Sequence, residues 1–302
     1  MATGCALDFD EVHQVESLRV LAVQAEPPEI APGEGTSVSV LWADPKGNGR
    51  EVDFVWWVCA GFVFGADLES CEMIVPPQKI SSAEGGDRLD IPVTPEDILD
   101  TIDMPDGMGY LNITFIGLMC ADGKLPSEEK LANPKGYEHI DDICKGGEAV
   151  SFFRTLLLSE SEDPQENPGI ERVMFKGEPL TPLEEEGEPP VLKCKEKEDC
   201  NLDVSLKLFM TEGSEQTYEV VEFGKVKEVK ETLFVSWYVT GGGFEDGYRS
   251  MVDDEKYDTP EGPFETVWQP EAPGTYTLYA VAHDVRGGAS WKTFSFEIAP
   301  AR

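Results

Sequence analysis

Apolar and polar side chains alternate along short segments of this chain, and the alternation predicts β-strands. In segment 293–298, Phe294, Phe296 and Ile298 share one side of an extended backbone, and the polar residues between them share the other. Such a period of two is typical of a sheet with one buried face. Similar segments, separated by turn-forming residues, are expected at 18–23, 36–42, 51–58, 171–175, 204–210 and 234–239. The pattern predicts an all-β protein.

The predicted strands occur twice in the same order, which indicates two copies of one domain. Segment 54–59 is matched by 234–239, and Gly109–Ile113 by Gly274–Leu278. The fold class we predict is two tandem immunoglobulin-like β-sandwich domains. The predicted boundaries are 1–17 (lipobox remnant and tether), 18–160 (first domain), 161–168 (acidic, proline-containing linker) and 169–302 (second domain). One short helix is predicted in the first domain, with Thr94 as N-cap, Pro95 in the first turn, and Ile102 at the end.

Three aromatic residues fit landmarks of the immunoglobulin fold. Trp57 and Trp237 stand where such domains bury a tryptophan on their third strand. Tyr276, after a Pro-Gly-Thr turn, fits a tyrosine corner. Leu278 stands where an antibody domain has its second inter-sheet cysteine. We therefore expect any disulfides to staple loops and not to join the two sheets.

The chain has seven cysteines, six of which form local pairs. Proximity favours Cys59–Cys71, Cys120–Cys144 and Cys194–Cys200, although six cysteines permit 15 connectivities. Such bridges would place the protein in an oxidising compartment. A zinc site is the alternative, but the sequence has no Cys-x₂₋₄-Cys knuckle, and its three histidines are scattered.

The seventh cysteine lies in the segment Ala2-Thr3-Gly4-Cys5, which resembles the end of a bacterial lipobox. The resemblance implies lipid attachment at Cys5, although Ala2 departs from the usual leucine and the preceding signal regions are not in this sequence. A free thiol near the terminus is the alternative. The sequence has no apolar run of about 18 residues, so no transmembrane helix is predicted.

Acidic residues outnumber basic ones 59 to 24, giving a formal net charge of −35. This charge repels nucleic acid and anionic lipid heads, so we expect no nucleic-acid partner and membrane contact only through an N-terminal lipid. The acidity reflects either solvation or cation binding. The best candidate for calcium is Asp253, Asp254, Glu255 and Asp258, although it lacks an ordered calcium-loop pattern. No other cofactor is predicted.

The closing segment contains Pro273-Gly274-Thr275-Tyr276, His283-Asp284, Gly287-Gly288 and Trp291 in this order. This pattern resembles the last strands of bacterial Ig-like and PKD-like domains. The layout also resembles two-domain surface lipoproteins of the myxobacterial (deltaproteobacterial) type, through Glu26-Pro27-Pro28, the Trp-Trp strand ending in Cys59, Asn167–Ile170 and Arg286-Gly287-Gly288. The resemblance implies a fold and a lipid-anchored place at the outer membrane or cell surface, but no reaction.

No catalytic motif is recognised, because the sequence has no Gly-x-Ser-x-Gly, His-Glu-x-x-His or Walker pattern. His283-Asp284 has no indicated nucleophile, and we expect Asp284 to hold a turn. The predicted function is a non-catalytic cell-envelope module that binds a surface protein or polysaccharide through its loops. Phe244, Tyr248 and Tyr257 are either contact anchors or packing over the sheet end. Alternatives are an accessory subunit of a secretion or fibre complex, a calcium-dependent adhesin and a hydrolase.

Overall fold

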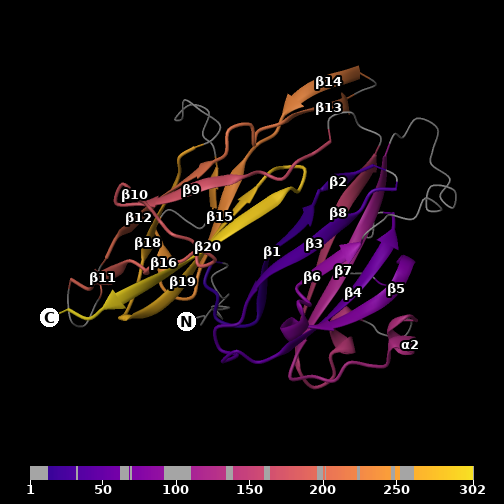
Figure 1. Ribbon diagram of the computed structural model, residues 1–302, viewed down its shortest axis with the longest axis horizontal. Coiled ribbons are helices and arrows are strands. Elements are labelled where there is room, and N and C mark those ends of the chain that lie inside the picture. Colours follow the sequence, from indigo (N-terminus) through magenta and orange to yellow (C-terminus); the bar gives the residue numbers. More distant parts are fainter. Residues whose placement is uncertain are drawn as a thin grey trace, which may run out of the picture.

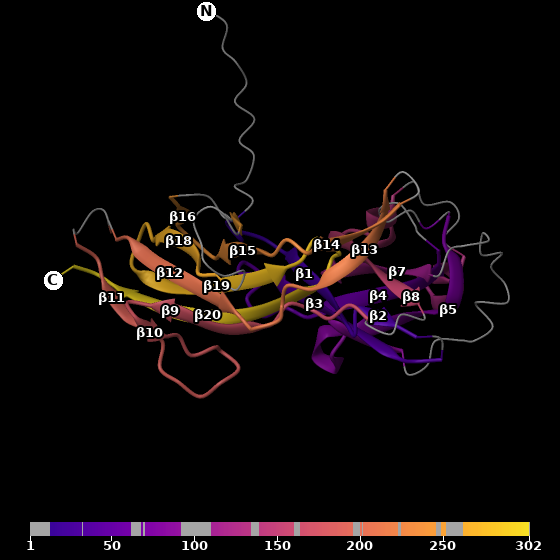
Figure 2. The same cartoon turned by 90° about the horizontal axis from the view of Figure 1, so that it is seen from above.

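The protein folds as two β-sandwiches that lie next to one another along its long axis (Figures 1 and 2). The computed structural model describes residues 13–31, 33–61, 68, 70–91, 110–133, 139–159, 164–195, 200, 202–222, 225–245, 249–251 and 262–301. None of the helices in these ranges is long and apolar enough to cross a membrane.

The first sandwich packs a five-stranded sheet against a three-stranded sheet. The larger sheet has the order β2 (Glu29–Ile30), β8 (Glu148–Ser159), β7 (Tyr110–Ala121), β4 (Val52–Ala60) and β5 (Glu72–Ser81). The smaller sheet has the order β1 (Arg19–Glu26), β3 (Thr36–Ala43) and β6 (Arg88–Ile91). Only the pairing of β2 with β8 is parallel among the described strands of this sandwich.

The second sandwich packs two five-stranded sheets. One has the order β11 (Val191–Lys193), β20 (Ala289–Ala299), β19 (Gly274–His283), β15 (Phe234–Val239) and β17 (Arg249–Met251). The other has the order β10 (Glu178–Pro179), β9 (Ile170–Phe175), β12 (Val204–Met210), β18 (Phe264–Gln269) and β16 (Gly243–Phe244). A separate hairpin joins β13 (Thr217–Glu222) to β14 (Lys225–Lys230).

The two sandwiches repeat one topology, which confirms the predicted fold class. In the first, β2 runs parallel to β8, and β7, β4 and β5 follow antiparallel. In the second, β11 runs parallel to β20, and β19, β15 and β17 follow in the same way. This strand order, with a short strand paired in parallel to the last strand of each sandwich, is that of an immunoglobulin-like sandwich.

The inter-sheet core of the first sandwich contains Trp56, and this corrects the expectation for Trp57. Phe54, Trp56 and Val58 point into the core between the sheets, with Phe115 from β7. Trp57 is also fully buried, but on the opposite face of β4. In the second sandwich Trp237 lies in the inter-sheet core, as predicted. The assignment to Trp57 fails because neighbouring residues of a strand point to opposite faces.

A second apolar cluster covers the outer face of the first sandwich's large sheet. Trp57, Ile116 and Leu118 from the sheet pack against Leu131 and Ile143 from the β7–β8 connection outside it. The Trp57 indole N–H donates to the Leu131 carbonyl oxygen over 3.1 Å. This connection carries the helical turn α2 (Glu128–Leu131) and the 3₁₀ turn η2 (Ile140–Ile143), and η1 (Ser82–Glu84) follows β5. The helix predicted from Thr94 to Ile102 lies outside the described residues.

All three predicted disulfides are present, and each staples a connection within one sandwich. Cys59–Cys71 closes the β4–β5 connection, Cys120–Cys144 the β7–β8 connection, and Cys194–Cys200 the β11–β12 connection. Cα separations are 5.1, 5.5 and 4.3 Å. The first two disulfides border the outer cluster, so they hold the connections that cover this cluster against the sheet.

The tyrosine corner is also confirmed. The Tyr276 hydroxyl donates to the Ala272 carbonyl oxygen over 2.7 Å, and the Tyr276 ring packs edge-on against Trp268 at 5.3 Å. We expect Tyr276→Phe to lower the free energy of unfolding by about 1 kcal/mol, the net value of one hydrogen bond. Urea unfolding followed by tryptophan fluorescence measures this. Tyr218→Phe is the control, and an equal loss in both variants would contradict the assignment.

Candidate functional site: the joint between the sandwiches

Residues 13–15, which are predicted from the sequence to lie in the N-terminal segment 1–17 with the tether, belong to the joint between the two sandwiches. The Val15 N–H donates to Val239 O over 2.9 Å, and the Val239 N–H donates to His13 O over 3.0 Å. The Gln14 amide donates to Gly242 O over 2.9 Å. Val15 is fully buried, so the segment is held through backbone pairing and apolar burial. Residues 1–12 lie outside the described residues.

An apolar cluster joins the outer faces of two sheets, one from each sandwich. From the first half of the chain come Val15, Leu21, Ala22, Leu41 and Ala43; from the second come Tyr279 and Val281, with Tyr238 and Trp291 packed beside them. Most of these side chains are at least nine-tenths buried. Because burial of apolar surface is the main favourable term in association, this cluster holds the sandwiches together.

A chain of ion pairs lies beside the apolar cluster. Arg286, in the β19–β20 turn, bonds to Glu29 Oε2 at 3.0 Å and to Glu231 Oε1 at 3.3 Å. Glu29 belongs to β2 of the first sandwich, and Glu231 lies at the base of the β13–β14 hairpin of the second. The side chains of Glu29 and Glu231 are 5% and 0% exposed. Arg286 is therefore the shared ion-pair partner of two buried carboxylates that lie on different sandwiches.

The described part of the linker takes part in the same network. The Gln165 N–H donates to Glu29 Oε2 over 2.8 Å, and its side-chain amide lies 3.2 Å from both oxygens of Asp284. The Asn167 side chain donates to Ala25 O in the first sandwich and accepts from the Ala289 N–H in the second. The linker is therefore fixed by both sandwiches.

Arg154 of β8 reaches from the first sandwich toward the β19–β20 turn of the second. Its Nε is buried and has no hydrogen-bond partner in the described part of the chain. Burial lowers the pKa of Arg154, and the negative charge of Asp284 opposes this. A Cβ on Gly287 would lie 2.3 Å from the Arg154 guanidinium, and Gly287 has φ = +98°. The turn therefore needs glycine both for its backbone conformation and for the close approach of Arg154.

Glu231 is the group whose titration the joint perturbs most clearly. Burial, together with the nearby negative charge of Asp284, raises the pKa of Glu231 to about 7. Hydrogen bonds from Gln216 and Arg286 act in the opposite direction. Among the described residues, the joint thus gathers the carboxylates of Glu29, Glu231 and Asp284 around two guanidinium groups.

Two open pockets flank the joint. One, about 260 Å³, is lined by Pro28, Asn112, Thr155, Leu157, Gln165 and Arg286. The other, about 320 Å³, is lined by Ser39, Leu41, Trp42, Asp87, Arg88 and Trp291. Both include residues from each half of the chain. They are therefore shallow features of the joint and depend on the relative placement of the sandwiches.

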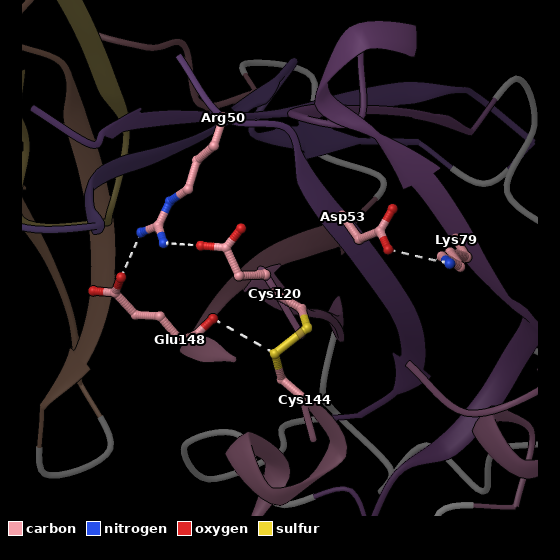
Figure 3. The surroundings of a disulfide bond; sticks show 7 residues. Arg50, Asp53, Lys79, Cys120, Cys144 and Glu148 are labelled. Carbon is pink, nitrogen blue, oxygen red and sulfur yellow. Dashed lines mark hydrogen bonds and ion pairs between the residues drawn. A yellow bond between two sulfur atoms is a disulfide. The ribbon is translucent and has the colours of Figure 1, made fainter. Parts of the chain in front are cut away.

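A second charged cluster lies around the β3–β4 turn of the first sandwich (Figure 3). Arg50 bonds to Asp44 at 2.7 Å, to Asp122 at 2.6 Å and to Glu148. These hydrogen bonds raise the pKa of Arg50 above its ordinary value. Glu148 begins β8 next to the Cys120–Cys144 bridge, as Figure 3 shows. The cluster therefore ties the β3–β4 turn to the stapled β7–β8 connection.

Of the lipidation, binding and metal residues predicted from sequence, Phe244 is the one that lies among the described residues. Phe244, expected as an exposed contact anchor, is only 9% exposed, and its ring lies edge-on to His13 at 5.2 Å. The alternative of packing at the sheet end is correct for this residue, because β16 places it in the core. Cys5, Tyr248 and Tyr257 lie outside the described residues, as do Asp253, Asp254, Glu255 and Asp258. Among the described residues, no group of three or more His, Cys, Asp or Glu side chains is placed to hold a metal.

The expected role of Asp284 as a turn residue is confirmed. Its carboxylate accepts a hydrogen bond from the Gly288 N–H over 2.7 Å. The neighbouring His283 ring stacks on Phe234 with centroids 4.7 Å apart. The sequence placed Asp284 in a turn but did not indicate Glu29, Arg154 or Glu231, which carry no local motif.

No protein-family model matches this chain, and no curated protein matches it. Solved structures similar to it include the D0-D1 domain of intimin, with 9% identity, a TM-score of 0.24, and coverage of 92% of this chain and 98% of that one. Fibronectin(III)-like modules of Clostridium thermocellum CbhA match with 12% identity, a TM-score of 0.25, and 94% and 95% coverage. The Yersinia pseudotuberculosis adhesin InvE matches with 10% identity, a TM-score of 0.22, and 92% and 58% coverage. Since all three TM-scores are low, the fold assignment rests on the strand order of the structure itself.

Proposed function

We propose that this protein is a non-catalytic module of the cell envelope that acts as one stiff body. The observation that carries the proposal is the joint, where an apolar cluster, an ion-paired network and the linker all connect the two sandwiches. A joint of this kind restricts the relative motion that two tandem domains otherwise have. The loops at the ends of the sandwiches are then held at a fixed separation and orientation.

The proposed location is the outer membrane or cell surface, with a lipid on Cys5. Three disulfides favour an oxidising compartment, and a net charge of −35 favours a solvated surface over nucleic-acid contact. The proposed partner is a surface protein or polysaccharide bound by the loops, because a sandwich scaffold alone specifies no ligand. Calcium binding by the acidic residues of segment 253–258 stays a prediction.

The alternative of an accessory subunit joined by strand addition receives less support. Strand β5 lies at the edge of the first sandwich's large sheet and is ten residues long. Pro76 and Pro77 occupy its centre and lack the N–H groups that a partner strand would pair with. Prolines on an edge strand are a common protection against such pairing.

The test is isolation of the protein from cell envelopes together with its Cys5→Ser variant. We expect the N-terminal peptide of the wild type to carry a diacylglycerol mass at Cys5. We also expect covalent cross-linking to capture the same surface partner only when the protein is anchored. An unmodified N-terminal peptide with a free thiol at Cys5 would contradict the proposed lipid anchor. Small-angle scattering data that fit only a range of angles between the two sandwiches would contradict the proposal that they form one stiff body.

A further inference from the structure

The joint buries more negative than positive charge. Three carboxylates, Glu29, Glu231 and Asp284, surround the guanidinium groups of Arg286 and Arg154. Glu29, Glu231 and Asp284 are at most 5% exposed. A buried charge without a partner is costly, and the usual response of a protein is to take up or lose a proton. The geometry therefore leaves one carboxylate in excess.

Glu231 is the carboxylate best placed to take up the compensating proton. Glu231 shares the Arg286 guanidinium with Glu29. Asp284 accepts hydrogen bonds from the Gly288 N–H and the Gln165 side-chain amide. Glu29 receives three donors, from Arg286, the Gln165 N–H and the Ser159 hydroxyl. A carboxylate with more donors keeps its negative charge more easily. Glu231 receives two donors, both at 3.3 Å.

The charged and titratable groups around Glu231 come from every element packed against it. They are Glu29 on β2, Arg154 on β8, Asp284 and Arg286 in the β19–β20 turn, His283 at the end of β19, Tyr218 on β13 with its ring 5.1 Å from Arg286, and, at the hairpin base, the partly buried Glu215 with its exposed partner Lys230.

We propose that this cluster makes the joint respond to pH: the two sandwiches are locked together while Glu231 carries a proton, and the lock weakens when that proton leaves. The structure links Glu231 to the linker through Gln216. The Gln216 N–H donates to Glu231, and its side chain accepts from the Glu166 N–H over 2.8 Å. Loss of the proton at Glu231 therefore acts on the linker as well as on Arg286.

The direction of the effect follows from proton linkage. The pKa of Glu231 is raised from 4.5 to about 7 in the folded protein, so the closed joint binds the proton more tightly than the open chain. The contribution of that proton is complete at pH 4.5 and below, and it is lost as the pH rises through about 7. The difference of about 2.5 pKa units sets an upper limit of about 300-fold on the change in the closing equilibrium.

Amide hydrogen exchange of the full-length protein between pH 5.5 and 8.5 tests the proposal. The reporters are the Gln165, Val15 and Ala289 amides, which lie in the joint, and the Ile116 amide of the central strand β7 serves as internal reference. After correction for the intrinsic pH dependence of exchange, we expect protection of the joint amides to fall at least tenfold toward pH 8.5. Protection of Ile116 should not change.

Three variants assign the effect to Glu231. Glu231→Gln cannot titrate, and its joint amides should keep the same protection across the whole range. His283→Gln and Glu265→Gln, a surface carboxylate paired with Lys207, should keep the wild-type profile. A flat wild-type profile would overturn the proposal. So would an unchanged profile in Glu231→Gln, and a flat profile in His283→Gln would assign the response to the histidine instead.

Discussion

Replacing Arg286 by alanine is expected to lower the free energy of unfolding by about 3–5 kcal/mol, the usual cost of leaving a buried charge without its partner. Arg286 is the ion-pair partner of both Glu29 and Glu231. The variant leaves two carboxylates that are at most 5% exposed on either side of the joint. The loss should be larger at pH 8 than at pH 5.5, because Glu231 is protonated at the lower pH.

Urea unfolding at both pH values measures this, with Arg88→Ala as the control. Arg88 also forms an ion pair, with Asp90, but both side chains are more than half exposed. Surface pairs of this kind contribute about 0–1 kcal/mol. If Arg286→Ala loses no more stability than Arg88→Ala, the ion pairs do not hold the joint.

The two-sandwich fold was predictable because its determinants are local. Alternation over six to eight residues indicated the strands, and the repeated order of those strands indicated the duplication. The cysteine pairs are near in sequence, so proximity was sufficient to pair them. The turn before Tyr276 placed the tyrosine corner by the same local reasoning.

The face of Trp57 was not predictable from alternation. Strand β4 is buried on both faces, since Trp56 points into the inter-sheet core and Trp57 into the outer cluster. In such a strand apolar residues are continuous, and a shift of one residue exchanges the two faces. The sequence signal for the outer cluster was the pair of disulfides near the ends of β4 and β7. These disulfides hold the β4–β5 and β7–β8 connections, which pack on the apolar outer face of the sheet.

The joint was not predictable because its partners are distant in sequence. Glu29 and Arg286 are 257 positions apart. Val15 is an isolated apolar residue among polar neighbours, so it carries no periodic signal, and its burial depends on a sheet from the other half of the chain. Tertiary packing of this kind gives a residue a role that its local sequence does not show.

Replacing Trp57 by alanine is expected to lower the free energy of unfolding by about 3–5 kcal/mol, as for other large buried aromatic residues. Trp57 is fully buried at the centre of the outer cluster, and its indole also satisfies the Leu131 carbonyl. The variant leaves a cavity beneath the stapled connections and an acceptor without its donor. The β7–β8 connection should then become accessible to protease while the inter-sheet core is retained.

Chemical unfolding and limited proteolysis measure the two effects, with Phe153→Ala as the matched control. Phe153 pairs with Ile116 across β8 and β7, but it is 46% exposed. Its loss removes an aromatic ring beside the cluster without leaving a closed cavity, so we expect a cost of about 1 kcal/mol or less. A similar small cost in Trp57→Ala, with no new cleavage between Cys120 and Cys144, would show that the disulfides hold these loops without the apolar cluster.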